Sequence, residues 1–204
     1  MTAIRRAAYL LILCLVMSYS FGQYHWKLTR NKDGIKVYVA ENPRSKYKSI
    51  KVECILPGDF DRLIHILTDI DHLKDWVYNT KLSYLIKKIS AYDLYYYTET
   101  SIPWPMSNRD VVVHLRILKD TLGRALRVTS INENRLVPEK DGKVRVVYSS
   151  INWYVTMLAG KGMGIVYTFE ADPGGSLPAW LVNSFADKGP YESFKKLSEI
   201  LSER

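Results

Sequence analysis

Alternating apolar and polar residues dominate the chain after Trp26. Ile35, Val37 and Val39 are each followed by a polar or amphipathic residue, and the run from Ile50 to Cys54 repeats this pattern. A two-residue repeat is typical of a strand with one buried and one exposed face. The sequence Glu-Asn-Pro-Arg-Ser at residues 41–45 has the residue types of a turn. The pattern therefore predicts two strands joined by a tight turn.

A helical repeat replaces this alternation after Pro57-Gly58. Counting from Phe60, apolar residues recur at the i, i+3, i+4 and i+7 positions, which lie on one face of a helix. Asp59 stands where its side chain can cap the first turn of that helix. We expect Asp71 to cap a second, shorter helix that carries Leu73, Trp76 and Val77.

The two-residue repeat returns at Thr80 and continues through several strands with no helix between them. Short connections make such neighbours antiparallel, because a parallel pair needs a crossover of a dozen or more residues. A turn at residues 172–175 then leads into a helix from Leu177 to Leu201. We expect Gly189-Pro190 to interrupt this helix, since proline removes a backbone hydrogen bond. The expected strands cover residues 82–87, 94–100, 111–118, 126–132, 144–153 and 165–171.

An antiparallel sheet of about eight strands buries its apolar face only if another element covers it. The C-terminal helix is the expected element with enough length for this, and it carries an apolar stripe. The residues of this stripe are Leu181, Phe185, Phe194, Leu197 and Leu201. The sequence therefore predicts an α+β fold in which a curved antiparallel sheet wraps around a long C-terminal helix. The concave interior of such a sheet is either packed solid or holds a ligand.

The first 22 residues differ in kind from the rest. Arg5 and Arg6 precede an apolar run from Ala7 to Met17, and small and polar residues follow as far as Gly22. This order is typical of a secretory signal peptide, and the run is too short to cross a bilayer comfortably. We expect cleavage near Gly22, one domain over residues 23–204, and a periplasmic or secreted mature protein. Cleavage would leave Cys54 as a single cysteine and exclude an internal disulfide.

The chain is moderately basic, with a formal net charge of +8 at pH 7. Its lysines and arginines are scattered, and no block of five or more occurs, which argues against a nucleic-acid surface. Two uses of this charge stay open. One is an ordinary solvated surface, and the other is weak, transient contact with anionic lipid headgroups at a membrane surface.

Signatures of catalysis or cofactor binding are missing from the sequence. The four histidines never occur at metal-ligand spacing, so we expect no metal. The glycine-rich residues 160–164 precede a strand, whereas a phosphate-binding loop opens a helix. Cys54 lies mid-strand on an apolar face, where cysteine is most often an inert packing residue. We therefore expect no catalytic residues and no cofactor.

Candidate ligand contacts follow from the direction of the side chains. Val111, Val113 and Leu115 form the apolar face of one strand, and counting back by twos places Arg109 on the same inward face. A buried guanidinium needs a carboxylate, loop carbonyls or the polar head of a ligand. Several tyrosines on one concave face would suit an amphipathic guest. The expected ligand contacts are Tyr84, Tyr96, Trp104, Arg109, Val113, Leu115, Tyr167, Phe169, Leu181 and Phe185.

The chain carries recognisable motifs at residues 33–38, 73–76, 103–105, 108–110, 144–145 and 172–183. In this order and spacing they resemble the START domains, the lipid-transfer domains related to the steroidogenic acute regulatory protein. The resemblance runs roughly from Trp26 to Leu201 and implies a helix-grip fold with an internal tunnel for one lipid. It also implies that the loop holding Trp104, together with the last helix, forms a lid over the tunnel. Sterol-carrying members tend to have a basic residue six positions after the arginine that matches Arg109, but Leu115 stands there in this chain.

The leading hypothesis is an exported, soluble lipid-binding or lipid-transfer protein that shields one hydrophobic molecule from water. An alternative is a cyclase-like enzyme on a similar grip fold, in which Arg109, Tyr84, Tyr96 and Glu99 would orient and polarise a hydrophobic substrate. A third possibility is an interaction module whose interior is packed solid.

Overall fold

The computed structural model describes residues 24–160 and 162–203, and the expected signal peptide lies outside these ranges. Sixteen elements follow one another in these residues. The strands are β1 (Lys27–Lys32), β2 (Ile35–Asn42), β3 (Ser45–Leu56), β4 (Thr80–Ser90), β5 (Asp93–Thr100), β6 (Asn108–Lys119), β7 (Ala125–Asn132), β8 (Lys143–Arg145), β9 (Tyr148–Leu158) and β10 (Gly162–Asp172). The helices are α2 (Phe60–Thr68), η1 (Ile70–His72), α3 (Leu73–Trp76), η2 (Asn134–Leu136), α4 (Ala179–Ser184) and α5 (Lys188–Ser202).

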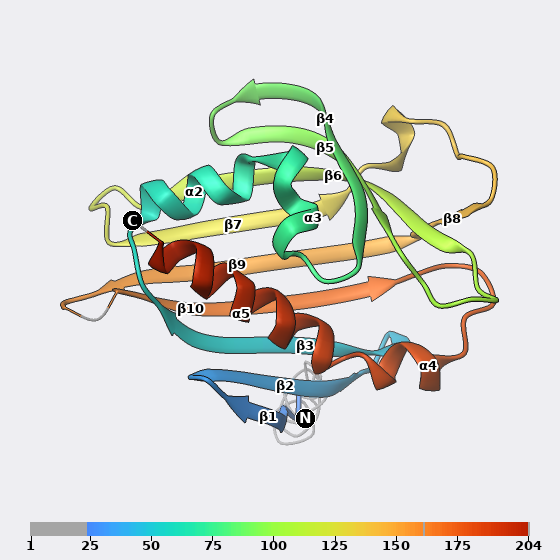
Figure 1. Ribbon diagram of the computed structural model, residues 1–204, viewed down its shortest axis with the longest axis horizontal. Helices are drawn as coiled ribbons and strands as arrows, with labels where there is room; N and C mark the ends of the chain where they lie inside the picture. Colours follow the sequence, from blue (N-terminus) through green and yellow to red (C-terminus); the bar gives the residue numbers. More distant parts are fainter. Residues whose placement is uncertain (1–23, 161, 204) are drawn as a thin grey trace, which may run out of the picture.

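A single ten-stranded sheet curves around the helices, as Figure 1 shows. The strand order is β1-β2-β3-β10-β9-β7-β6-β5-β4, and β8 lies beside β6 outside this path. The two ends of the path, β1 and β4, do not pair with each other, so the sheet stays open. All pairs are antiparallel except β6 with the short β8. The predicted helix-grip architecture is therefore confirmed, with more strands than the sequence indicated.

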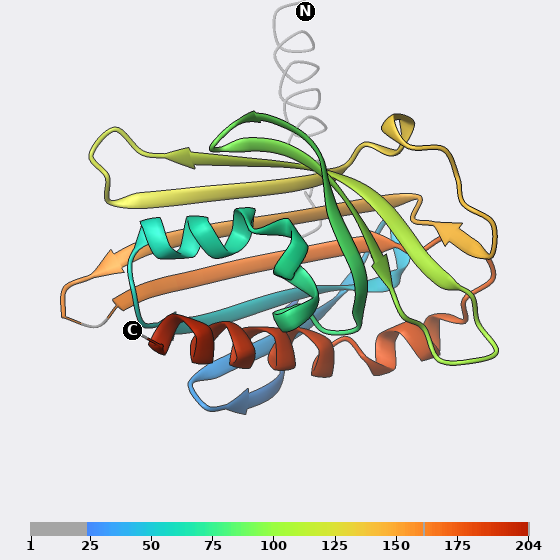
Figure 2. The same cartoon turned by 45° about the horizontal axis from the view of Figure 1, so that its top comes forward.

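The helices α2, α3 and α5 lie on the same side of the sheet (Figure 2). The C-terminal helix α5 contacts β2, β3 and α3, and its buried residues are Tyr191, Phe194, Leu197 and Leu201. Burying a large apolar side chain contributes about 1.5–3 kcal/mol, so this face is enough to hold α5 against the sheet. None of the described helices has the length and apolar composition of a membrane span.

The helix α2 begins as the sequence predicts. The Asp59 carboxylate accepts a hydrogen bond from the backbone N–H of Arg62 at 2.9 Å. The cap expected at Asp71 is wrong, because α3 begins after His72 and no side chain caps its first turn. Asp71 instead lies in the 3₁₀ turn η1 that joins α2 to α3. The 3₁₀ turn thus stands where the sequence pattern suggested the capped start of a second helix.

The C-terminal helix is interrupted earlier than predicted. Residues 185–187 separate α4 from α5, while Gly189 and Pro190 lie in the first turn of α5. The N–H groups of a first turn have no partner within the helix, so a proline there removes no hydrogen bond. Pro190 is therefore compatible with the start of a helix, and the expected break at Gly189-Pro190 is wrong.

Two details of the strands also differ from the sequence prediction. The run 144–153 forms two strands, β8 and β9, because the intervening N–H groups of Val146 and Val147 donate to Asp110 O and Asp172 O. The edge strand β1 was not predicted. Its residues are largely exposed and carry no apolar alternation.

Candidate functional site

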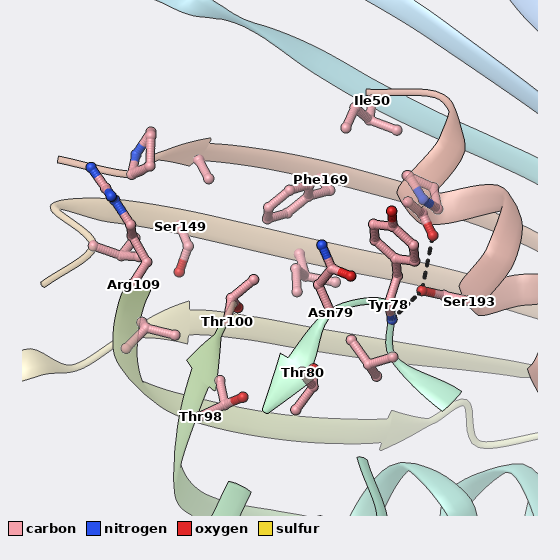
Figure 3. A pocket seen from close by; sticks show the side chains of 18 of the residues that line it. Ile50, Tyr78, Asn79, Thr80, Thr98, Thr100, Arg109, Ser149, Phe169 and Ser193 are labelled. Atoms are coloured by element: carbon pink, nitrogen blue, oxygen red, sulfur yellow. Dashed lines mark hydrogen bonds between the residues drawn. The ribbon is translucent and has the colours of Figure 1, made fainter. Parts of the chain in front are cut away.

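A cavity of about 410 Å³ lies between the concave face of the sheet and the helices. Inward side chains of β5, β6, β9 and β10 form one part of its wall, and Figure 3 shows several of them. Ile102 and Pro103, from the β5–β6 connection, and residues of the α4–α5 segment form another part. Most of the lining side chains are apolar or aromatic. The interior is therefore not packed solid.

The structure brings most of the expected contact residues to this wall. The two-residue repeat places the inward positions of β5, β6 and β10 on the concave face, as predicted, and α4 adds residues from the other side. Those that line the cavity are Tyr96, Arg109, Val113, Leu115, Tyr167, Phe169, Leu181 and Phe185.

Tyr84 lies on the opposite face of the sheet, so its expected inward direction is wrong. Its ring stacks on Tyr97 at 4.9 Å between centroids, and its hydroxyl accepts a hydrogen bond from Lys140 Nζ at 3.2 Å. From Leu82 to Leu85 the strand β4 pairs regularly with β5, so Tyr84 lies beside Tyr97, and Ser83 lies beside the cavity-lining Thr98. The side chains alternate as expected, but Leu82 and Tyr84 are on the outer face. Ser83, next to Tyr84, is buried in its place and donates to Ile70 O at 2.6 Å.

Trp104 points away from the cavity and is 92% exposed. It lies in a turn in which the N–H of Met106 donates to Pro103 O. The turn carries Trp104 beyond the wall, while its neighbours Ile102 and Pro103 line the cavity. The contact expected from Trp104 is therefore not present in this structure.

Arg109 lies at one end of the cavity, where β5, β6 and the turn after β10 meet (Figure 3). The residue is 5% exposed. Its Nη1 donates to Ser107 O and its Nη2 donates to Gly174 O at 3.3 Å. The buried Nε–H has no acceptor among the described residues, and no described carboxylate forms an ion pair with Arg109. Of the partners considered above, the protein therefore supplies loop carbonyls.

The glycines of the turn after β10 permit this close approach. Gly174 and Gly175 have φ of +70° and +62°, a conformation that glycine adopts without strain. A Cβ on Gly174 would lie 2.7 Å from Arg145 O, and one on Gly175 would lie 3.4 Å from Arg109 Nη2. Burial away from water lowers the pKa of the Arg109 guanidinium, although its charge persists because an arginine starts from a very high pKa.

Asp110 faces away from the cavity, as the alternation predicts. Its carboxylate binds Arg145 in a bidentate pair, with Nε–Oδ1 at 2.9 Å and Nη2–Oδ2 at 3.1 Å. The hydrogen bonds to Asp110 raise the pKa of Arg145. Asp110 is thus committed to Arg145 and does not compensate its neighbour Arg109.

Three hydroxyl groups near Arg109 were not singled out from the sequence. Thr98 and Thr100 of β5 and Ser149 of β9 line the cavity at the same end (Figure 3). Thr100 is the direct cross-strand neighbour of Arg109. In the described part of the chain, these three hydroxyls have no protein hydrogen-bond partner. Counting by twos along β5 predicts the inward direction of Thr98 and Thr100, because they follow the inward Tyr96 at two-residue steps.

Aromatic rings form the middle of the wall. Trp153, Tyr167 and Phe194 pack together with centroid distances of 5.0–5.2 Å. Burial raises the pKa of both Tyr96 and Tyr167, so both hydroxyls stay neutral at physiological pH. This region offers apolar surface and two neutral hydroxyls to a guest.

Glu99, which the enzyme alternative requires, lies outside the cavity. It accepts from Asn108 Nδ2 at 2.7 Å and from Lys81 Nζ at 3.1 Å, and Lys143 Nζ lies 3.5 Å away. Of the four residues in that alternative, Arg109 and Tyr96 line the cavity, while Tyr84 and Glu99 do not.

Comparisons with known proteins agree with this geometry. The family model described as "START domain" matches residues 20–204. An uncharacterized protein of Pseudomonas aeruginosa is 31% identical over 182 residues, which cover 88% of each chain. The mouse phosphatidylcholine transfer protein is 31% identical over 170 residues, 80% of this chain and 78% of the mouse protein. The crystal structure of a STAR-related lipid transfer protein from Xanthomonas axonopodis superposes with a TM-score of 0.80 at 31% identity, covering 87% of this chain and 99% of that one.

Proposed function

The chain belongs to the START domain family, and from this premise we propose that it is an exported carrier that holds one lipid in the cavity beside Arg109. Family membership supports lipid binding in general. The observation that carries the proposal for this chain is the cavity itself, about 410 Å³ of mostly apolar space with polar groups gathered at one end. Cavities of this size and character are typical of small-molecule sites.

Binding would be driven by the removal of apolar surface from water, at about 25 cal/mol per Å². The neutral hydroxyls and Arg109 would orient the guest rather than supply most of the affinity. Polar groups fixed at one end of an apolar pocket act in this way in many ligand sites.

The lid of the proposed carrier consists of the β5–β6 connection, residues 101–107, and the helix α4. Both contribute side chains to the cavity wall, and both lie at the same end of the molecule in Figures 1 and 2. Each also presents an exposed tryptophan, Trp104 at 92% and Trp180 at 72%. Tryptophan favours the interface between membrane and water. We therefore include transient docking of this lid on a membrane surface in the proposal.

Export is part of the proposal because of the residue order before Gln23. Two arginines, an apolar run and a polar segment ending at Gly22 are the parts of a signal peptide. Cell fractionation of the full-length chain, followed by determination of the mature N-terminus, tests this part. Recovery of uncleaved protein in the cytoplasm would contradict it.

A catalytic role is the weaker candidate. The enzyme alternative relied on Tyr84 and Glu99 inside the cavity, and both lie on its outside. The residues that do line the cavity offer one guanidinium and neutral hydroxyls, which suit binding and orientation.

Native mass spectrometry of the protein purified from its own compartment tests the carrier function. We expect a lipid adduct that is released by denaturation and restored by incubation with lipid vesicles. Val111→Phe, which fills the cavity beside Arg109, should reduce uptake, whereas Val166→Phe on the exposed face of β10 should not. Protein that is isolated empty and takes up no lipid would overturn the proposal.

A further inference from the structure

The charges on the cavity wall are unbalanced. Arg109 and Lys48 line the cavity, and none of its lining residues is an aspartate or glutamate. Lys48 already has an acidic neighbour outside the cavity, because its Nζ lies 3.4 Å from Glu41 Oε1. In the described residues, Arg109 has no such neighbour. The net charge presented to a guest is therefore positive and is concentrated at the Arg109 end.

Arg109 also has donors to spare. A guanidinium carries five N–H donors, and the protein accepts two hydrogen bonds from it here. Leaving a buried guanidinium with neither an anion nor a full set of acceptors costs free energy. An anionic group bound at this end would lower that cost, and the hydroxyls of Thr98, Thr100 and Ser149 would supply further donors to it.

The size of the cavity limits the guest to one chain. A cavity of about 150 Å³ accommodates benzene, with its six carbons, so 410 Å³ accommodates roughly 16 heavy atoms at the same packing. A phospholipid with two 16-carbon chains has about 50 heavy atoms, roughly three times that number. The inward positions from Arg109 to Leu115 extend along roughly 20 Å of strand, enough to follow one extended chain.

From these observations we infer that the cavity selects a single-chain lipid with an anionic head, a carboxylate or a phosphate monoester, which Arg109 binds. This inference rests on the proposed carrier function and specifies its ligand class. The head lies beneath the lid, next to Pro103 and Leu181, and the tail passes Tyr96 and Tyr167 toward Leu115 and Trp153. Neutral and zwitterionic single-chain lipids of the same length bind less tightly, because they cannot compensate the guanidinium equally well.

Displacement of a fluorescent lipid from the delipidated full chain tests the inference at pH 7.5. The probes are palmitate, hexadecyl phosphate, hexadecanol, hexadecylphosphocholine, dipalmitoyl phosphatidylcholine and dipalmitoyl phosphatidate. We expect palmitate or hexadecyl phosphate to bind about ten- to a hundred-fold more tightly than hexadecanol, the range of a charge-assisted hydrogen-bonded contact. The better of these two ligands identifies the head as carboxylate or phosphate. Equal affinity for the charged ligands and hexadecanol would overturn the inference.

Variants of the same strand locate the effect. Arg109→Gln should weaken binding of the anionic ligand about ten-fold or more and binding of hexadecanol by much less, so that most of the preference for the anionic head is lost. Arg116→Gln is the matched control, because Arg116 lies on the opposite face of β6 with its side chain 60% exposed. If Arg109→Gln does not fold, the double variant Thr98→Val/Ser149→Ala should still reduce the ratio of the affinity for the anionic ligand to the affinity for hexadecanol. If a folded Arg109→Gln variant lost affinity equally for the anionic ligand and for hexadecanol, Arg109 would not be the group that recognises the negative charge.

The outcome also separates the inference from the proposed function. Tighter binding of dipalmitoyl phosphatidylcholine or dipalmitoyl phosphatidate than of any single-chain lipid would overturn the inference and leave the carrier function in place. If none of the probes bound, both the inference and the proposed carrier function would be overturned.

Discussion

Arg109 is buried and the side chain of Arg145 is only 7% exposed, but their charges are compensated in different ways. Arg145 uses all five of its donors, three of them on Asn134 O, Val137 O and Pro138 O and two on the carboxylate of Asp110. Arg109 uses two donors, both on carbonyl groups. The first arrangement is complete within the protein and holds residues 133–147 against β6. The second leaves capacity for a ligand.

Arg145→Ala should therefore be strongly destabilising. Removing one partner of a buried pair leaves Asp110 buried and unpaired, which costs about 3–5 kcal/mol in the free energy of unfolding. Arg135→Ala is the control, since Arg135 is 90% exposed and pairs with Glu133 at the surface, where such a pair contributes less than about 1 kcal/mol. Urea unfolding of both variants measures the difference. Equal midpoints would show that the Asp110 pair is not required for stability.

Cys54 is a buried cysteine within the hydrophobic core. Burial raises the pKa of its thiol from 9.0 to about 12. The reactive thiolate should therefore be scarce at pH 8 in the folded protein. In a Cys14→Ser background, we expect a thiol-reactive disulfide reagent to label Cys54 only after unfolding in urea.

The same shift has a defined sign for stability. Folding keeps the Cys54 proton on, so the contribution of this group is constant below about pH 9 and is lost as pH rises toward 12. Rapid labelling of Cys54 in the folded protein at pH 8 would contradict the raised pKa of its thiol. Cys54→Ala provides the blank for the measurement.

At the scale of elements, the cap of α2 offers a direct test. Asp59→Ala removes the hydrogen bond from the N–H of Arg62 and should reduce the free energy of unfolding by about 1 kcal/mol. Asp71→Ala removes an exposed carboxylate that caps no helix and should change it by less than about 0.5 kcal/mol. Thermal unfolding followed by circular dichroism compares the two. If Asp71→Ala reduced the free energy of unfolding more than Asp59→Ala, Asp71 would act as a helix cap, as the sequence suggested.

Strands whose apolar residues lie on the buried face were predictable, and the edge strand β4 was not. In β3 and β7 the alternation of buried and exposed residues follows the sequence pattern. In β4, at the edge of the sheet, the polar Ser83 faces inward and the apolar Leu82 and Tyr84 face outward. Counting by twos shows which residues share a face, but not which of the two faces is buried. The same limit applies to Pro190, which suits either a break or the first turn of a helix.

The candidate site could be predicted in part for similar reasons. Parity along β6 and β10 placed Arg109, Val113, Tyr167 and Phe169 on one face. The donors left over on Arg109 depend on the turn at Gly174 and on the commitment of Asp110 to Arg145, which are contacts between distant segments. The volume of the cavity depends on how α4 and α5 cross the sheet. Neither quantity can be read from a local pattern.

At the scale of the whole molecule, the charged end of the cavity lies next to the lid, and the apolar part of the cavity lies further from it. At one end Arg109 donates a hydrogen bond to Ser107 O of the lid, and Leu115 lies six residues further along β6. Opening the lid would expose the head of the guest before its tail. This order suits exchange with a membrane, because an anionic head can remain at the interface while the chain leaves apolar surroundings on one side and enters them on the other.

The exposed tryptophans of the lid should therefore control transfer rather than affinity. In Trp104→Ala/Trp180→Ala we expect lipid transfer between vesicles to slow by about ten-fold, since two aromatic anchors at the interface are lost. The affinity for the lipid and the thermal midpoint should stay unchanged, because these side chains are 92% and 72% exposed. Leu122→Ala is the control, an apolar residue 71% exposed in the β6–β7 connection at the opposite end of the molecule (Figure 1). A fluorescence transfer assay with donor and acceptor vesicles measures the rates. Equal slowing by Leu122→Ala, or an unchanged rate in the double variant, would show that the lid does not dock through these residues.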